Sequence, residues 1–474
     1  MIADRRVAAA VAVAAALARL PFVSRELAAW DSVAFARALD LGFFVGTDLA
    51  DQRPQAPGYI LYVGTAALLR PILGSPNAAL VAVSVAASAL ACAAIYLLCR
   101  RFASRPAALV AAAVYATGPL IWSYGEIAMP YAVLGFFSAL LAILFWDARH
   151  DTGHARLVAS VGFGVAAGFR QDLVLLLGPL WLWMVWPRPR EWPLAGVAAT
   201  AGGLIWLVPS ALASGGFAAY LHSVSVQSAR AAAFSASARG PAGAIDNLAM
   251  IVYSLGWALA AAAPVMLVVA LARLWAGRRP AGSGALFFAL WVLPALIFYG
   301  TVHIGAAGYI LSVVPAFAVL AGLLFDGATR DAGAGGRRVA AGIAGAAIAA
   351  NVLLFVAAPT PFSAAAIADH DRSLLDRVAY VRAHYPASAT VVLAQFDYIF
   401  VTWYLPEYRA LFFGPGPDAL SAGAPAVTVT PAGGAVLLFG PVPALPDDSA
   451  RTELLPGLAA LTRGSVRAYE ILMR

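Results

Sequence analysis

The chain has 474 residues, of which 62% are hydrophobic and only 12% are charged. One soluble core cannot bury so much apolar surface, so the composition excludes an ordinary soluble protein and predicts an all-α polytopic membrane protein. The formal net charge is +7 and all 31 basic residues are arginines, which excludes chemistry that needs a Schiff-base or Walker-type lysine. The arginines are spread over many short connections, so we expect no nucleic-acid partner.

Hydrophobic runs in chain order predict about eleven membrane spans. They lie at residues 7–23, 77–98, 107–123, 130–146, 157–169, 172–186, 194–213, 247–270, 283–301, 306–325 and 338–357. Alternate connections differ in charge: one set holds 15 arginines and 6 acidic residues, and the other holds 8 of each. By the positive-inside rule the first set, with the N-terminus, is cytoplasmic. This predicts an integral protein of a bacterial inner or plasma membrane.

Residues 58–73 are apolar enough to be a further span. Counting them as one, however, would place most of the later basic connections outside. We therefore predict a juxtamembrane or re-entrant element that returns to the external face and ends at Arg70 and Pro71. The first external loop then covers residues 24–76.

That loop carries an unusual density of ionisable residues for so apolar a chain. Between Trp30 and Gly64 it holds four carboxylates, two arginines and an Ala-Pro-Gly-Tyr turn that ends at Tyr59. Ionisable groups at the membrane surface often mark chemistry or a charged ligand. Asp31 opens a segment that suits a helix lying on the membrane, and it is equally well explained as an N-cap.

Three later external turns also carry candidate residues. Glu126 lies in the short turn 122–131, where a solvated acid is the alternative explanation. Arg170 interrupts a long apolar stretch, and it would either bind a lipid phosphate or pair with Asp172. His303 and Tyr309 flank the turn 301–310, where a histidine is often only an interfacial residue.

The composition changes after about residue 358. Long hydrophobic runs stop, and the remaining segments mix helical periodicity with short strand-like runs. We expect two domains: a transmembrane domain over residues 1–358 and a small external α/β domain over residues 359–474.

Taken together, these segments resemble the GT-C superfamily of polytopic glycosyltransferases, in particular glycosyltransferase family 39 and the protein O-mannosyltransferases. Trp30-Asp31-Ser32 is similar to the acidic motif of the first external loop. Residues 53–59 are similar to its His-Pro-Pro-Gly-Tyr-like segment, from which Gln55 and Ala56 depart. Residues 168–172 are similar to a Gly-x-x-x-Arg-Pro segment, with Gln171 in place of proline.

The resemblance implies transfer of a sugar, with inversion, from a polyprenyl-phosphate donor to a hydroxyl of a lipid, glycan or protein acceptor on the external face. It implies catalytic roles for Asp31, as proton acceptor, and Glu126. It further implies substrate-binding roles for Arg53, Tyr59, Arg170, His303 and Tyr309. Of these, Arg170 and then Arg53 would place positive charge beside the leaving phosphate. The sequence carries no metal signature and no certain cofactor, although a divalent cation held by Asp31 and Glu126 would serve the same purpose.

Two other functions remain open from the sequence. A transporter or flippase of lipid-linked sugars would also have many spans and interfacial arginines, but the paired broken segments typical of transporters are not evident. A GT-C scaffold that has lost catalysis and binds a partner is the second alternative, because of the departure at Gln55.

Overall fold

The computed structural model describes residues 2–47, 52–151, 154–277, 283–330, 332–394, 397–412, 435–439 and 468–472. The chain forms two compact units. Unit 1 comprises Met1–Leu27 and Phe35–Ala368, and unit 2 comprises Ala28–Ala34 and Asp369–Arg474. Two helices, α2 (Trp30–Leu41) and α17 (Ala364–His384), contain residues of both units.

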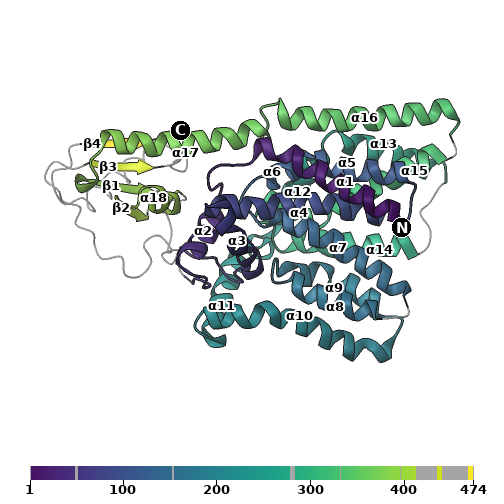
Figure 1. Ribbon diagram of the computed structural model, residues 1–474, viewed down its shortest axis with the longest axis horizontal. Coiled ribbons are helices and arrows are strands. Elements are labelled where there is room, and N and C mark those ends of the chain that lie inside the picture. Colours follow the sequence, from purple (N-terminus) through teal and green to yellow (C-terminus); the bar gives the residue numbers. More distant parts are fainter. Residues whose placement is uncertain are drawn as a thin grey trace. The chain divides into compact units, whose positions relative to one another are not determined.

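Unit 1 is a bundle of helices (Figure 1). Its elements in chain order are α1 (Ile2–Arg19), η1 (Leu20–Phe22), α3 (Ile60–Leu73), α4 (Pro76–Cys99), α5 (Arg105–Thr117), α6 (Pro119–Tyr124), α7 (Tyr131–His150), α8 (Ala155–Ala166), α9 (Asp172–Val185), η3 (Pro189–Glu191), α10 (Trp192–Ala213), α11 (Phe217–Ala233), α12 (Ala236–Leu259), α13 (Ala262–Trp275), α14 (Ser283–Thr301), η4 (Ala307–Ser312), α15 (Val314–Arg330) and α16 (Ala334–Val356).

Within the described residues, six helices are long and apolar enough to cross a bilayer. They are Pro76–Cys99, Tyr131–His150, Pro189–Ala213, Ala236–Leu259, Gly284–Thr301 and Ala334–Val356. Helices α3, α8, α9 and α13 are shorter but also apolar. The predicted class, an all-α polytopic membrane protein, is confirmed.

Besides the first span, which ends in the short 3-10 helix η1, three of the predicted spans are not single helices, which corrects the sequence-based segmentation. Residues 107–123 are divided between α5 and α6 at Gly118, which precedes a proline, and residues 306–325 are divided between η4 and α15. Residues 247–270 are divided between α12 and α13, where Ala260 has a φ of 43°. Pro264 follows in the first turn of α13, and a proline cannot donate the backbone hydrogen bond that a continuous helix needs there.

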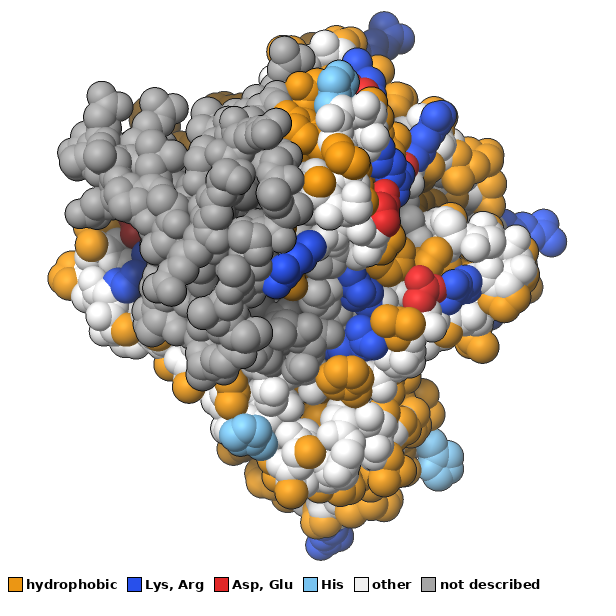
Figure 2. All heavy atoms as spheres, turned by 90° about the vertical axis from the view of Figure 1, so that its left-hand side faces the viewer, with side chains coloured by type: hydrophobic (Ala, Val, Ile, Leu, Met, Phe, Trp, Pro, Cys, Tyr) orange, Lys and Arg blue, Asp and Glu red, His pale blue; other side chains and the backbone are white. Residues whose placement is uncertain are grey.

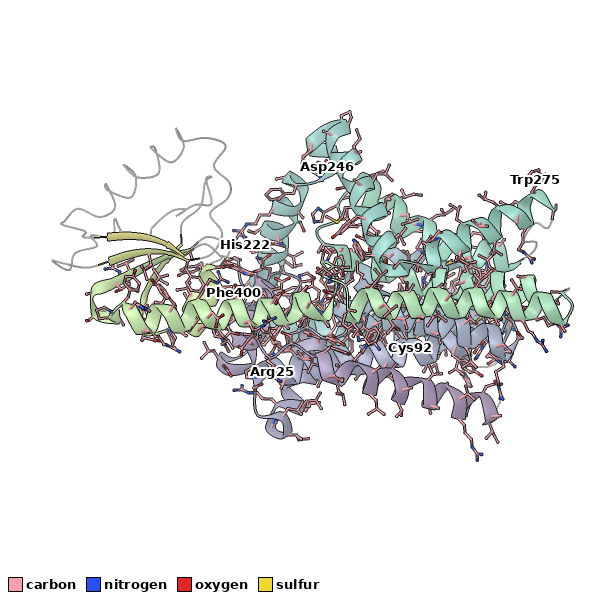
Figure 3. The ribbon with its side chains drawn as sticks, turned by 90° about the horizontal axis from the view of Figure 1, so that it is seen from above. Arg25, Cys92, His222, Asp246, Trp275 and Phe400 are labelled. Atoms are coloured by element: carbon pink, nitrogen blue, oxygen red, sulfur yellow. The ribbon has the colours of Figure 1, made fainter. Side chains whose placement is uncertain are left out.

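Helices α12 and α13 nevertheless continue along the length of the bundle. Asp246, in α12, and Trp275, at the end of α13, lie far apart along its long axis (Figure 3). Hydropathy locates this apolar stretch correctly, but it does not report a break between two equally apolar helices.

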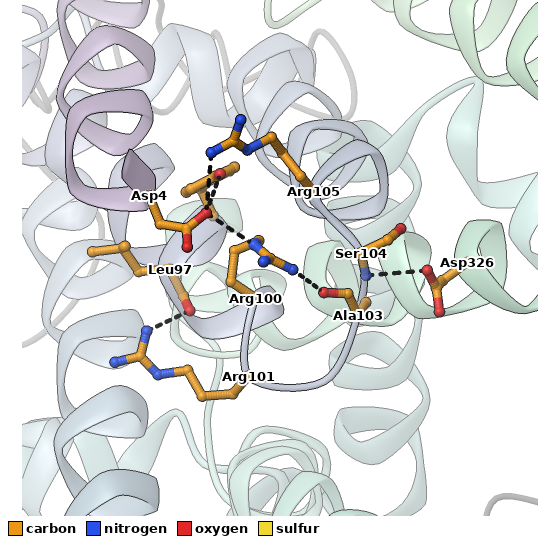
Figure 4. A network of polar contacts seen from close by, with 9 residues as sticks. Asp4, Leu97, Arg100, Arg101, Ala103, Ser104, Arg105 and Asp326 are labelled. Carbon is orange, nitrogen blue, oxygen red and sulfur yellow. Dashed lines mark hydrogen bonds and ion pairs between the residues drawn. The ribbon is translucent and has the colours of Figure 1, made fainter. Parts of the chain in front are cut away.

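The connections predicted to share the cytoplasmic side meet at one end of unit 1. Asp4 accepts hydrogen bonds from Arg100 Nε and from the Tyr96 hydroxyl, both at 3.0 Å (Figure 4). The backbone N–H of Ser104 donates to Asp326 at 3.1 Å. The start of α1, the α4–α5 connection and the end of α15 are therefore neighbours, as the alternation of charge predicts.

Close packing of α8 against α10 depends on glycines. A Cβ atom on Gly164 would overlap the backbone oxygen of Ala199, and one on Gly202 would overlap that of Val161. Trp206 Nε1 donates to the Gly164 carbonyl at 3.0 Å. A Cβ atom on Gly168 would overlap Trp206 of α10, so the four-residue spacing of Gly164 and Gly168 serves helix packing, as it commonly does in apolar spans.

Unit 2 contains a parallel four-stranded sheet in the order β2-β1-β3-β4. The strands are β1 (Thr390–Ala394), β2 (Arg409–Phe412), β3 (Ala435–Phe439) and β4 (Ala468–Leu472), and α18 (Tyr398–Tyr404) connects the first two. Arg377 of α17 pairs with Asp397 at 2.7 Å, just before α18. The predicted α/β character is confirmed.

Candidate functional site

Arg170 lies in the turn between α8 and α9, where its guanidinium is only 3% exposed. It makes a two-point ion pair with Asp172, the first residue of α9, with Nε–Oδ1 at 3.2 Å and Nη2–Oδ2 at 2.7 Å. This fork geometry is the strongest arrangement available to an arginine and a carboxylate. The structure therefore shows the internal pair that the sequence left open as one of two possibilities.

Three tyrosine rings surround the same guanidinium. The Arg170 Cζ atom lies 5.2 Å from the ring centre of Tyr59 and 5.0 Å from those of Tyr131 and Tyr309. Each distance is within the range of a cation–π interaction. We call Tyr59, Tyr131 and Tyr309 the tyrosine cage. It assembles three segments that are far apart in sequence around one buried cation.

The backbone around Tyr59 fixes the first member of the cage. Tyr59 has a φ of 54°, unusual for a residue other than glycine, and it caps the N-terminus of α3. The N–H of Leu61 donates to the carbonyl of Gly168 at 3.1 Å, which ties α3 to the turn that carries Arg170. The ring of Phe35 packs edge-on against Tyr59, with centroids 5.8 Å apart.

Tyr131 and Tyr309 are held by close packing near η4. A Cβ atom on Gly308 would overlap the ring of Tyr131, so the absence of a side chain there makes room for the ring. The Tyr299 hydroxyl donates to the carbonyl of Tyr309 at 2.9 Å. Tyr131 was not among the residues that the sequence singled out. The one sequence feature that could have indicated it is its position directly after Pro130, at the end of the external turn that contains Glu126.

His303 lies beside the cage. Its ring is edge-on to that of Tyr309, with centroids 6.2 Å apart. Burial, with a smaller contribution from the positive charge of Arg239, lowers the pKa of His303 below its ordinary value of 6.5. The imidazole is therefore neutral at pH 7, and it offers a hydrogen bond rather than a positive charge.

Arg53 lies in the loop before α3 and is half-buried. Its guanidinium lies over the ring of Phe44 at 5.0 Å, and its Nε atom has no hydrogen-bond partner among the described residues. The loop is braced at both sides of Arg53, because Gly46 donates to the Pro54 carbonyl at 3.1 Å and Tyr220 donates to the Pro57 carbonyl at 3.2 Å. The cationic side chain of Arg53 thus lies on a loop that backbone and side-chain hydrogen bonds hold in place.

Glu126 is fully buried, which excludes the alternative explanation of a solvated acid at the external turn. Among the described residues its two carboxylate oxygens make no well-formed hydrogen bond, although the Trp122 indole N–H lies close enough to favour the ionised form slightly. Burial raises the pKa of Glu126 from 4.5 to about 9, against the opposing effect of the positive charge of Arg19. A buried carboxyl that is protonated at neutral pH is poorly suited to accept a proton or to hold a metal ion.

Asp31 lies in the first turn of α2 and belongs to unit 2. It is the second residue of the helix and not its N-cap, but a negative charge in this position is favourable near the positive end of the helix dipole. Among the described residues, no group of three or more histidine, cysteine or acidic side chains is placed to hold a metal ion.

The described surface in Figure 2 carries arginine and acidic side chains interspersed with hydrophobic ones. No broad field of one sign is visible on this face.

Comparisons with known proteins give one matching family profile. The sequence profile of the family described as dolichyl-phosphate-mannose-protein mannosyltransferase matches residues 54–213, a region that includes Tyr59, Tyr131 and Arg170. No curated protein matches the chain significantly.

Solved structures of ArnT share the fold at low sequence identity. ArnT from Cupriavidus metallidurans bound to undecaprenyl phosphate has a TM-score of 0.56 and 14% identity, over 87% of this chain and 86% of that one. The apo state of the same enzyme gives 0.55 and 15%, with the same coverage. The Archaeoglobus fulgidus oligosaccharyltransferase, in complex with zinc and sulfate, gives 0.49 and 15%, over 90% of this chain and 63% of that one.

At such identities the likeness to ArnT establishes the fold alone. Together with the matched family profile, it confirms the resemblance to the GT-C superfamily that the sequence motifs indicate.

Proposed function

We propose that this chain is a membrane glycosyltransferase that moves a sugar from a polyprenyl-phosphate carrier to an acceptor hydroxyl. The observation that carries the proposal is the tyrosine cage around Arg170. Two of its tyrosines and the arginine come from the region matched by the mannosyltransferase profile. The GT-C fold supports it further, because ArnT, which shares that fold, has been solved with undecaprenyl phosphate.

The cage suggests a division of labour between two arginines. The charge of Arg170 is already neutralised by Asp172 and covered by three rings, so its proposed role is to hold the tyrosines in place. Arg53, whose Nε atom has no hydrogen-bond partner among the described residues, becomes the better candidate to contact the lipid phosphate. This reverses the order of preference that the sequence suggested.

The proposed reaction is a single displacement at the anomeric carbon of the sugar. The acceptor oxygen forms a bond to that carbon while the bond from the carbon to the phosphate oxygen breaks. The lipid phosphate leaves with the electron pair, and the acceptor proton passes to the carboxylate of Asp31. One displacement inverts the anomeric configuration. Tyr59 and the neutral His303 would donate hydrogen bonds to the substrate.

Binding of undecaprenyl phosphate to purified protein tests the assignment of Arg53. Because an arginine–phosphate contact is charge-assisted, we expect Arg53→Ala to weaken binding roughly 10- to 100-fold without lowering the melting temperature. Arg25→Ala, which removes an exposed arginine from the same external loop, is the matched control and should bind normally. Equal affinities for all three proteins would remove Arg53 from the site.

A further inference from the structure

An apolar groove lies between α5, α13, α15 and α16 of unit 1, and it plays no part in the proposed reaction. Its volume is about 270 Å³, close to the lower limit of roughly 300 Å³ for small-molecule sites. Met266 and Val269 line it from α13, Phe325 lines it from α15, and Gly336 and Ala340 line it from α16. Small residues on α16 leave space that larger side chains would fill.

One end of the groove reaches the side of the basic connections. Arg273 lies one helical turn beyond Val269, on the same face of α13. Its guanidinium packs against the backbone of α15, where a Cβ atom on Gly327 would overlap it. Arg273 is therefore held at the end of the groove instead of extending freely into solvent.

The acidic residue of α15 nearest in sequence to Gly327 already has other partners. Asp326 pairs with Arg330 and accepts the N–H of Ser104. Among the described residues no carboxylate pairs with Arg273. Arg337 is exposed and follows Gly336, so a second arginine stands close to the groove in sequence. A half-buried guanidinium that pairs with no carboxylate of the described residues, beside an apolar groove, is complementary to a molecule with a phosphate and a hydrocarbon chain.

We propose that this groove binds one acyl chain of an anionic glycerophospholipid whose phosphate pairs with Arg273. The lipid belongs to the leaflet on the side of the basic connections, where the charge of Arg273 and Arg337 favours an anionic headgroup. The site is separate from the tyrosine cage, and it would stabilise the loosely packed α13, of which only Ala262 is buried.

Native mass spectrometry of protein taken from nanodiscs measures the retained lipid. The nanodiscs contain phosphatidylcholine alone or with phosphatidylglycerol. We expect the wild-type protein to retain phosphatidylglycerol selectively. Arg273→Gln should reduce that retention about tenfold, the usual effect of losing a charge-assisted hydrogen bond. Arg338→Gln, which removes a neighbouring charge from a residue of α16 that does not line the groove, should have little effect.

A second pair of variants tests the groove itself. Ala340→Phe fills it, whereas Ala341→Phe adds the same ring at an exposed position of α16 that does not line it. Only Ala340→Phe should abolish the selective retention. Equal retention of both lipids by the wild-type protein, or unchanged retention in both Arg273→Gln and Ala340→Phe, would overturn the proposal. A third result would also overturn the proposal: if the wild-type protein is a dimer and Ala340→Phe makes it monomeric, a second copy of the chain occupies the groove and not a lipid.

Discussion

Arg170 and Asp172 show how two interpretations of one arginine can be separated. A buried guanidinium that is paired and enclosed by rings stabilises the fold, and removing it leaves the carboxylate without its partner. We expect Arg170→Ala to lower the free energy of unfolding by about 3 kcal/mol. Arg170→Ala combined with Asp172→Ala should recover much of that loss in thermal unfolding experiments in detergent.

Arg101 and Asp147 provide the control for that measurement, because their pair is more exposed at 31% and 46%. Arg101→Ala should cost no more than about 1 kcal/mol. If Arg170→Ala is as stable as Arg101→Ala but fails to bind undecaprenyl phosphate, Arg170 contacts the lipid and the division of labour between the arginines is wrong.

The raised pKa of Glu126 predicts that the stability of the protein depends on pH. In the unfolded chain its carboxyl ionises near pH 4.5, but in the folded protein it keeps its proton up to about pH 9. The folded state therefore binds more protons within this window, and stability falls as the pH rises through it. Glu126→Gln removes this contribution.

Unfolding at about pH 5 and about pH 8 checks this prediction. The decline in melting temperature between the two values should be smaller in Glu126→Gln than in the wild-type protein. An identical decline in both proteins would mean that Glu126 is ionised in the folded state and has a partner there.

The sequence named some residues of the tyrosine cage but not their organisation. Arg170 was singled out because it interrupts an apolar stretch, and Tyr59 and Tyr309 were singled out through the resemblance to GT-C enzymes. The structure brings these three side chains together. Tyr131 was missed, since an aromatic residue at the start of an apolar helix is unremarkable until its neighbours are known. The burial of Glu126 was also missed, because a short polar turn gives no sign that other helices cover it.

At the scale of elements, the close contact between α8 and α10 predicts that alanine substitutions at two adjacent glycines of α10 differ in their effect on stability. A methyl group at Gly202 would meet the backbone of Val161, whereas one at Gly203 would meet nothing within 4 Å. We expect Gly202→Ala to cost about 1–3 kcal/mol through overpacking. Gly203→Ala should be neutral or stabilise the helix by up to about 1 kcal/mol.

Thermal unfolding of the two variants in the same detergent tests whether Gly202 fixes the contact between α8 and α10. The substitutions are chemically identical and one residue apart, so a difference reports packing rather than helix propensity. Similar melting temperatures would show that α8 and α10 separate readily and that the glycines do not fix their contact.

Hydropathy predicted where apolar helices lie better than it predicted their ends. It located α4, α7, α10, α14 and α16, where one long helix fills the apolar run. It failed at Ala260, because both sides of the break are apolar and only the backbone conformation changes. The short strands of unit 2 were predicted as an α/β pattern, but their parallel order depends on pairings between segments far apart in sequence.

For the whole molecule, the gathering of the basic connections at one end of unit 1 agrees with the predicted alternation of the loops. The orientation in the membrane remains a prediction from the positive-inside rule. A maleimide that cannot cross membranes should label Ser75→Cys in intact cells, and it should label Gly335→Cys only after lysis. Both positions are exposed, and Cys92 and Cys99 are buried. The reverse pattern would invert the topology, and equal labelling from outside would mean that the alternation of sides is wrong.

The central claim is that the chain transfers a sugar and does not merely carry or bind lipid. The most direct test supplies purified protein in nanodiscs with a labelled polyprenyl-phosphate sugar and with acceptors that offer free hydroxyls. We expect labelled acceptor of inverted configuration to form, and we expect Asp31→Asn to slow its formation by about 10²- to 10⁴-fold, the range for loss of a general base, while lipid binding is kept. Donor that binds or crosses the membrane without any transfer of sugar would contradict the account.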